Sequence, residues 1–174
     1  MAKIDSYEWY LKNTLKEELY YQIPIYQRPY QWTKENCEKL LDDLFFNYED
    51  DRESDYFCGS LVLVKSDPNS KTETYDIVDG QQHLSTFILL AKVLADLYIY
   101  NGLDPEYLEY LQASWKDRYT ERKRLSFNTI GLNAKDDFQD ALDFFDNSHA
   151  SKNNKNNYLK NAVCLKNYLE KKRD

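Results

Sequence analysis

The chain has 174 residues, a formal net charge of -7, 42 % hydrophobic residues and 16 % aromatic residues, and this aromatic content is typical of a folded chain rather than a disordered one. No apolar run reaches the roughly 18 residues of a membrane span, and the three cysteines are an odd number spread far apart, which excludes a disulfide framework. We therefore expect a cytoplasmic protein, and because neither G-x-x-x-x-G-K nor G-x-G-x-x-G occurs, the P-loop and Rossmann phosphate cradles are excluded.

The first fifty residues predict a helix, a strand and a second helix. Apolar residues recur at helical spacing over residues 4–19, and the aromatic run 19–26 is typical of a strand. Pro24 favours an edge position or an early end for that strand. Thr33 is a suitable N-cap for an amphipathic helix that extends to about Tyr48, before the acidic cluster 49–51.

A hairpin and a long helix follow. Residues 56–65 and 72–78 predict two strands joined by turn residues at 66–70, so we expect them to pair as a hairpin. Asp79 and Gly80 end the second strand. The helix after them continues to Tyr98 and is apolar over much of its circumference, which predicts a central place in the core.

Helices predominate beyond residue 100. We expect them over 105–113, 134–145 and 159–169, with a flexible Asn/Lys/Ser-rich loop at 147–157. The predicted fold class is α+β, with a small mixed sheet and packed helices in residues 1–100. A helical extension follows in residues 101–174, and its charged end is consistent with the start of a larger helical region.

One polar segment, residues 23–32, could bind an anion. Arg28 lies among aromatic residues, and a guanidinium can stack on a ring while its fork binds a phosphate. Gln27 adds amide donors, and Tyr26 could stack on a base. The alternative is structural: the aromatics pack a loop, and Arg28 pairs with a nearby carboxylate.

A second polar segment, residues 77–86, joins a strand to a helix start. Free N–H groups and the helix dipole favour an anion there, and Gly80 permits a close approach. Gln81, Gln82 and His83 add side-chain donors, and Asp79 could hold a divalent cation or orient a water molecule. In the alternative, Asp79 caps the helix and the glutamines are solvated. The two segments form one site only if they meet in space.

A basic stretch offers a different function. It contains Lys116, Arg118, Arg122, Lys123 and Arg124, and residues 151–174 hold seven basic side chains against two acidic ones. Such a stretch either contacts DNA phosphates or forms a solvated face.

The two polar segments resemble the N-terminal domain of the GmrSD-type (type IV, modification-dependent) restriction endonucleases, which is similar to the ParB/sulfiredoxin fold. The resemblance covers roughly residues 10–100, and the helical part fits the family only loosely. The residues that carry it are Ile23, Pro24, Tyr26, Gln27, Arg28, Tyr30, Trp32, Phe57, Gly59, Ser60, Asp79, Gly80, Gln81, Gln82, Leu84 and Thr86.

The resemblance implies binding and Mg²⁺-dependent hydrolysis of a nucleoside triphosphate (NTP), coupled to cleavage of modified phage DNA. An HNH-type nuclease domain, C-terminal or separate, would be the partner. Gln27 and Arg28 would contact phosphates, and Asp79 and Gln82 would complete the pocket with the helix N-terminus. The family has Arg where this chain has His83, and a neutral imidazole offers less charge to a transition state.

We therefore predict a nucleotide-binding domain with Asp79 and His83 as catalytic candidates and Asp79 as the metal candidate. Two alternatives remain. One is a DNA-binding or nuclease module of the ParB-like type, and the other is a catalytically inactive scaffold.

Overall fold

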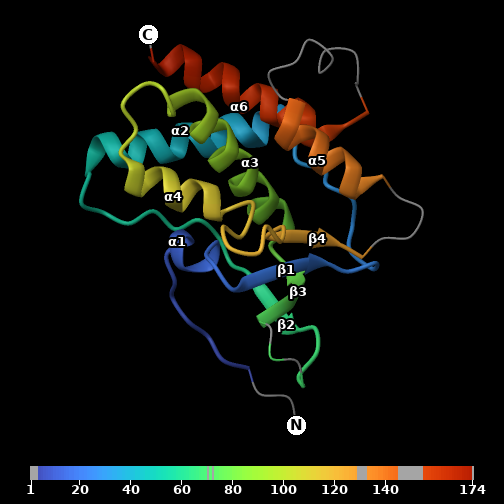
Figure 1. Cartoon of the computed structure of the whole chain (residues 1–174). Helices are drawn as coiled ribbons and strands as arrows, with labels where there is room; N and C mark the ends of the chain where they lie inside the picture. Colours follow the sequence, from blue (N-terminus) through green and yellow to red (C-terminus); the bar gives the residue numbers. More distant parts are fainter. Residues whose placement is uncertain (1–3, 70, 72, 129–132, 145–154, 174) are drawn as a thin grey trace.

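The computed structural model describes residues 4–69, 71, 73–128, 133–144 and 155–173 (Figure 1). The elements, in chain order, are α1 Leu11–Thr14, β1 Leu19–Ile23, α2 Lys34–Asp50, β2 Val62–Lys65, β3 Glu73–Asp79, α3 Gln81–Tyr98, α4 Pro105–Ala113, β4 Leu125–Phe127, α5 Ala134–Phe144 and α6 Asn157–Arg173.

The four strands form one mixed sheet in the order β2-β3-β1-β4. β2 and β3 pair antiparallel, so the predicted hairpin is confirmed. β1 lies parallel to β3 on one side and to β4 on the other. The carboxyl ends of β1, β3 and β4 therefore lie at the same edge of the sheet.

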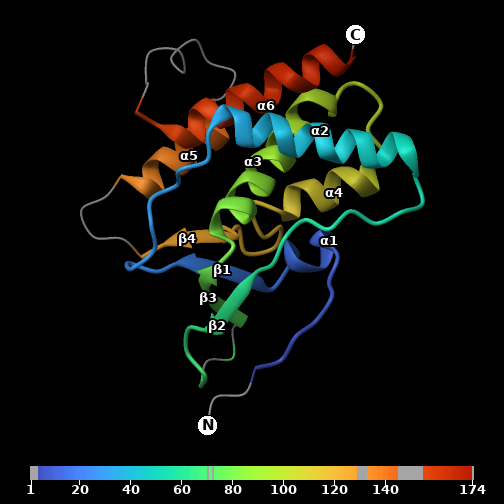
Figure 2. The ribbon, with the colours of Figure 1, turned by 180° about the vertical axis from the view of Figure 1, so that it is seen from behind.

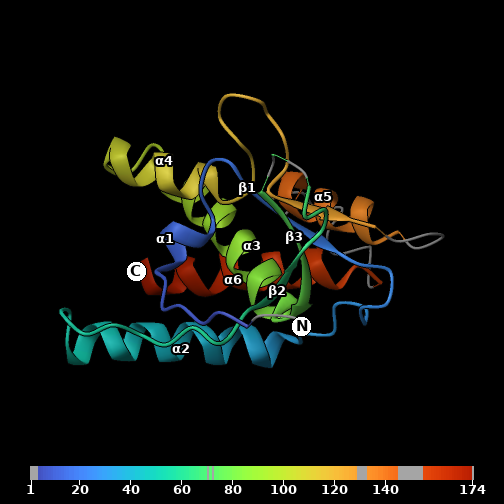
Figure 3. The ribbon, with the colours of Figure 1, turned by 90° about the horizontal axis from the view of Figure 1, so that it is seen from below.

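Helices α2 to α6 lie on one side of this sheet, with α3 between the strands and α6 (Figures 1 and 2). Viewed from below, the strands lie in front of α3 and α6, so these two helices leave the lower face of the sheet uncovered (Figure 3). The fold is thus α+β with a small mixed sheet and packed helices, as the sequence predicts.

A single hydrophobic core crosses the boundary that we expected near residue 100. Ile88 and Val93 of α3 are fully buried in the same cluster as Leu165 of α6. β4 also comes from beyond residue 100 and completes the sheet. Sheet and core are therefore built from both parts of the chain.

Several elements are shorter than predicted. Residues 4–10 are not helical, and only Leu11–Thr14 form α1. Ile4 and Tyr7 are exposed, so the helical pattern of this segment has no apolar surface to pack against. β1 is a central strand rather than an edge strand, but it does end directly before Pro24. The strand predicted from residue 56 begins only at Val62, after Gly59 with a φ of +117°.

Other predictions agree closely with the structure. Thr33 caps α2 in a reciprocal capping box with Asn36, and the bounds of α4 are as predicted. Most of the loop predicted at 147–157 lies outside the described residues. No helix in the described part of the chain is long and apolar enough to cross a membrane.

Candidate functional site

The two polar segments meet at the carboxyl edge of the sheet. After β1, the chain turns across the end of β3, and the Gln27 side chain fixes this turn. Gln27 Nε2 donates to the carbonyl oxygens of Ile77 at 2.9 Å and of Val78 at 2.8 Å. Segments some fifty residues apart in sequence are thereby joined.

Gln81 and Gln82 bind the same loop from the start of α3. Gln81 Nε2 donates to the Arg28 carbonyl oxygen at 2.6 Å. Gln82 Oε1 accepts from the backbone N–H of Gln31 at 2.9 Å and of Trp32 at 3.2 Å. The alternative in which these glutamines are solvated is wrong, because their amides hold the loop against the helix.

These bonds bear on the predicted contact between Gln27 and a phosphate. The amide nitrogen of Gln27 has two hydrogens and already serves two carbonyl oxygens, while its Oε1 cannot donate. A direct phosphate contact would require one of these bonds to break. As the structure stands, Gln27 positions Arg28 by fixing the turn that contains both residues.

Arg28 and Tyr26 project from this fixed loop. Both side chains are exposed, Tyr26 at 66 %. Among the described residues, no carboxylate forms an ion pair with Arg28, so the structural alternative for this side chain is not observed. Its backbone is held by Gln81 while its guanidinium faces solvent.

α3 begins at Gly80, and no side chain in the described part of the chain caps it. Gly80 occupies the N-cap position with a φ of +99°, so the alternative in which Asp79 caps the helix is wrong. The first intrahelical bond runs from Leu84 N–H to the Gly80 carbonyl, and the N–H groups before it have no intrahelical partner. A Cβ atom at Gly80 would lie 2.6 Å from the Ser60 carbonyl oxygen, so Ser60 and Leu61 close this side of the turn.

His83 lies in the first turn of α3, on an exposed face. Its ring makes an edge contact with Trp32, with the centroids 4.8 Å apart. Partial burial lowers the pKa of His83 below its ordinary value, and the nearby Asp79 carboxylate opposes this shift. The imidazole is therefore mostly neutral at pH 7, when it can both donate and accept a hydrogen bond.

Asp79 ends β3 and is exposed. The described residues contain no group of three or more His, Cys, Asp or Glu side chains placed to hold a metal ion. Asp79 therefore offers a single carboxylate. That suffices for Mg²⁺ only where phosphate oxygens supply further ligands, which is the usual arrangement at nucleotide sites.

The basic stretch lies at the opposite edge of the sheet, before β4 begins. Arg124 is fully buried, and it donates to the carbonyl oxygens of Ala113 and Leu19. Its assignment as a DNA-binding residue is thus incorrect, because its guanidinium is hydrogen-bonded inside the protein.

Its neighbours are partly engaged as well. Arg118 pairs with Glu109 at 3.2 Å, and the Arg122 guanidinium lies 3.9 Å from the centre of the Tyr20 ring. Lys116 approaches Glu121 at 3.9 Å. Lys123 is exposed.

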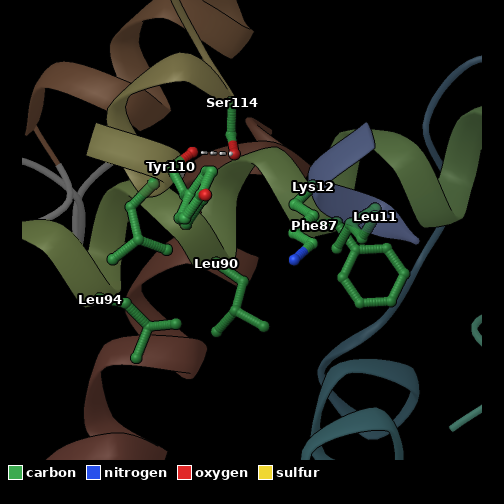
Figure 4. Close-up of a pocket in the computed structure, with 9 residues that line it drawn as sticks. Leu11, Lys12, Phe87, Leu90, Leu94, Tyr110 and Ser114 are labelled. Atoms are coloured by element: carbon green, nitrogen blue, oxygen red, sulfur yellow. Dashed lines mark hydrogen bonds between the residues drawn. The ribbon is translucent and has the colours of Figure 1, made fainter. Parts of the chain in front are cut away.

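A separate cavity of about 190 Å³ lies between α1, α3 and α4 (Figure 4). Its walls are mainly apolar, with Leu11, Phe87 and Leu90 among them, and none of the predicted site residues lines it. Such walls do not suit a polyanion.

Sequence reasoning missed the contribution of α6 to this site. Asn161 donates to the Tyr30 hydroxyl and to the Trp32 carbonyl oxygen, both at 2.8 Å. No local pattern marks Asn161, because it lies about 130 residues after its partners.

The α+β fold, together with a loop that glutamine side chains bind to the start of α3, defines a class of protein. It does not by itself define an activity. In a comparison with protein families, residues 10–173 match the family described as GmrSD restriction endonuclease, N-terminal domain. The chain therefore belongs to this family. The match extends through the helical part, well beyond residue 100. No curated protein matches the chain. Family membership makes the chain part of a restriction system.

Proposed function

We propose that this chain is the nucleotide-binding part of its restriction system, and that it binds the phosphates of an NTP where the loop 24–32 meets the start of α3. One observation carries the proposal. The backbone of Arg28 is bonded to Gln81 at the helix start, while the Arg28 guanidinium is exposed and forms no ion pair among the described residues. An exposed cation without an ion-pair partner, on a loop whose backbone is bonded to a helix start, suits a polyanion.

The remaining contacts follow from this geometry. The N–H groups of the first turn of α3 would donate to the anion, and the positive φ of Gly80 provides the sharp bend between β3 and this helix start. Tyr26 is free to stack on the base. Mg²⁺ would bind the exposed Asp79 carboxylate together with phosphate oxygens, and it would supply charge neutralisation there.

Hydrolysis is the second part of the proposal. Asp79 would orient the attacking water, and His83 would donate a hydrogen bond to the phosphates. A neutral His83 stabilises developing negative charge less than a guanidinium does, so we expect slow turnover. The DNA substrate and the HNH-type nuclease partner then belong to the wider restriction system, and nucleotide state would regulate cleavage of modified phage DNA.

A thermal shift screen with ATP, GTP, CTP and UTP tests the proposal, each with and without Mg²⁺. A ligand at about 100 times its Kd stabilises a protein by about 2.7 kcal/mol. For a chain of this length, that corresponds to roughly 5 to 10 °C in Tm. A shift with at least one NTP that inorganic sulfate does not reproduce supports the proposal, and the absence of any shift contradicts it.

Direct DNA binding by the basic stretch is the competing function, and it rests on the exposed Lys116, Arg118, Arg122 and Lys123. Binding through several phosphates loses affinity steeply with salt. Because Arg118 and Lys116 have acidic neighbours and Arg124 is buried, we place this function second.

A further inference from the structure

Tyr30 lies at the centre of a buried network behind the candidate site. Its side chain is only 5 % exposed, and its ring stacks on Tyr158 of α6 with the centroids 4.2 Å apart. Its hydroxyl lies 2.7 Å from the Thr86 hydroxyl, which in turn donates to the Gln82 carbonyl oxygen. Tyr30 thus links the loop to the first turns of α3.

α6 contributes the other side of this network. Asn161 is 2 % exposed, and its amide nitrogen gives one bond to the Tyr30 hydroxyl and one to the Trp32 carbonyl oxygen. Asn157 adds a bond from its own amide nitrogen to the Tyr30 carbonyl oxygen, at 3.3 Å. The helix therefore holds the loop two and four residues after Arg28.

The bonds form a closed circuit. α6 holds Tyr30 and Trp32, the Trp32 N–H donates to Gln82, and Gln82 belongs to the helix that Tyr30 reaches through Thr86. Without the Asn161 amide, the Trp32 carbonyl oxygen and the Tyr30 hydroxyl lose a buried donor. An unsatisfied buried polar group favours conformations that reach water, and here such a conformation would lift the loop off α3.

The geometry points to Asn161 as a positioning residue for the nucleotide site: it holds the Arg28 loop in the binding conformation without touching the ligand. This inference rests on the proposed function. Affinity falls when the binding conformation of the loop is only partly populated. The association constant for the nucleotide is then multiplied by the fraction of time that the loop spends in that conformation.

The test compares Asn161→Leu, which keeps the number and branching of the side-chain heavy atoms but removes both donations, with Asn167→Leu on an exposed position of the same helix. Two quantities are measured on the full chain. One is the affinity for ATP and GTP with Mg²⁺ by isothermal titration. The other is amide hydrogen exchange by NMR at Gln31 and Trp32, whose N–H groups donate to Gln82, with Tyr21 and Tyr75 in the paired strands as reference.

We expect Asn161→Leu to weaken nucleotide binding by about tenfold, which requires the loop to be displaced for most of the time, and to speed exchange at Gln31 and Trp32 by at least that factor, with the reference amides unchanged. Asn167→Leu should change neither quantity. Unchanged affinity, or exchange that accelerates equally in the strands, overturns the inference. If the wild-type chain binds no nucleotide, the proposed function fails, and exchange at the two loop amides alone decides whether Asn161 positions the loop.

Discussion

Side-chain chemistry divides the candidate site into groups that build it and groups that it leaves free. Glutamine suits the first role, because its amide both donates and accepts and carries no charge to desolvate. Three glutamines donate to backbone carbonyl oxygens where the loop 24–32 meets the end of β3 and the start of α3, namely Gln27, Gln81 and Gln82. Arg28, Asp79 and His83 stay exposed. A ligand would therefore contact charged or titratable side chains, while the backbone that carries them is held in place by the neutral glutamine side chains.

Gly80 is required at its position for two reasons, positive φ and lack of space. We predict that Gly80→Ala lowers the free energy of unfolding by about 2 kcal/mol or more. Gly102→Ala is the matched control, since Gly102 has a φ of +86° but open space where its Cβ would lie, with no atom of the described residues within 4 Å. That change should cost only about 1 kcal/mol. Urea denaturation measures both, and equal losses would show that the Ser60 carbonyl does not restrict Gly80.

His83 predicts a pH dependence of nucleotide affinity. Its pKa lies below the ordinary 6.5, so the ring is neutral at pH 7 and gains charge as the pH falls through that lowered value. The imidazolium attracts phosphate, and affinity should therefore rise by up to about fivefold as the pH falls from about 7.5 through that lowered pKa. His83→Gln removes this gain but leaves the protonation of the nucleotide itself unchanged. Parallel pH profiles for the two proteins would exclude His83 from the site.

At the scale of elements, a buried ionic cluster ties the segment before β4 to the start of β1. Asp117 is 2 % exposed and accepts from the Tyr20 hydroxyl and from the backbone N–H groups of Tyr119 and Thr120. Burial alone would raise the pKa of Asp117, but these hydrogen bonds outweigh burial and lower it. Arg124 supplies the positive charge from the interior. The basic stretch is therefore partly a structural element.

Arg124→Met tests this interpretation. The change removes two buried donations and leaves carboxylates nearby without their cation, so we predict a loss of about 3 kcal/mol in the free energy of unfolding. Lys123→Met, at an exposed neighbouring position, should change stability by less than about 0.5 kcal/mol. Chemical denaturation of both variants provides the comparison. Equal stability would mean that Arg124 contributes nothing to the interior.

The sequence predicts the long elements well because their signals are local. Helical periodicity and the Thr33 cap define α2, and the apolar circumference of α3 predicts its central place. Two failures have physical causes. β4 has three residues, too few for alternation to be recognised, and it forms only because β1 offers a parallel edge. The helical pattern of residues 4–10 has no surface to bury against, and short helices are marginal without packing.

At the scale of the whole molecule, α6 covers α2 and α3 and belongs to their core. Leu159, Leu165 and Leu169 are almost fully buried there. We predict that residues 1–128 alone, without α5 and α6, show no cooperative thermal transition and bind a hydrophobic dye. Circular dichroism against temperature measures this. A sharp transition in the fragment would instead support an independently folding domain before the helical extension.

The residue types of the candidate site could be predicted from the sequence, but the hydrogen bonds that join its segments could not. Arg28 and the turn at Gly80 are recognisable from residue types, because each presents a known device for binding anions. The bonds that join them span about fifty residues, and those from α6 about 130, and no local pattern encodes such pairings. For the same reason, the sequence could not show that the glutamine amides are used within the protein.

The most direct test of nucleotide binding where the loop 24–32 meets the start of α3 is isothermal titration of the wild-type chain and of Arg28→Ala. Both are titrated, in the presence of Mg²⁺, with the NTP that stabilises the wild type most. Arg52→Ala, which removes a guanidinium from an exposed position elsewhere, is the control. The account predicts saturable binding to the wild type and the control, and a loss of at least about a hundredfold in affinity for Arg28→Ala, with the thermal transition of that variant unchanged. Equal affinity of Arg28→Ala and the wild type would contradict it.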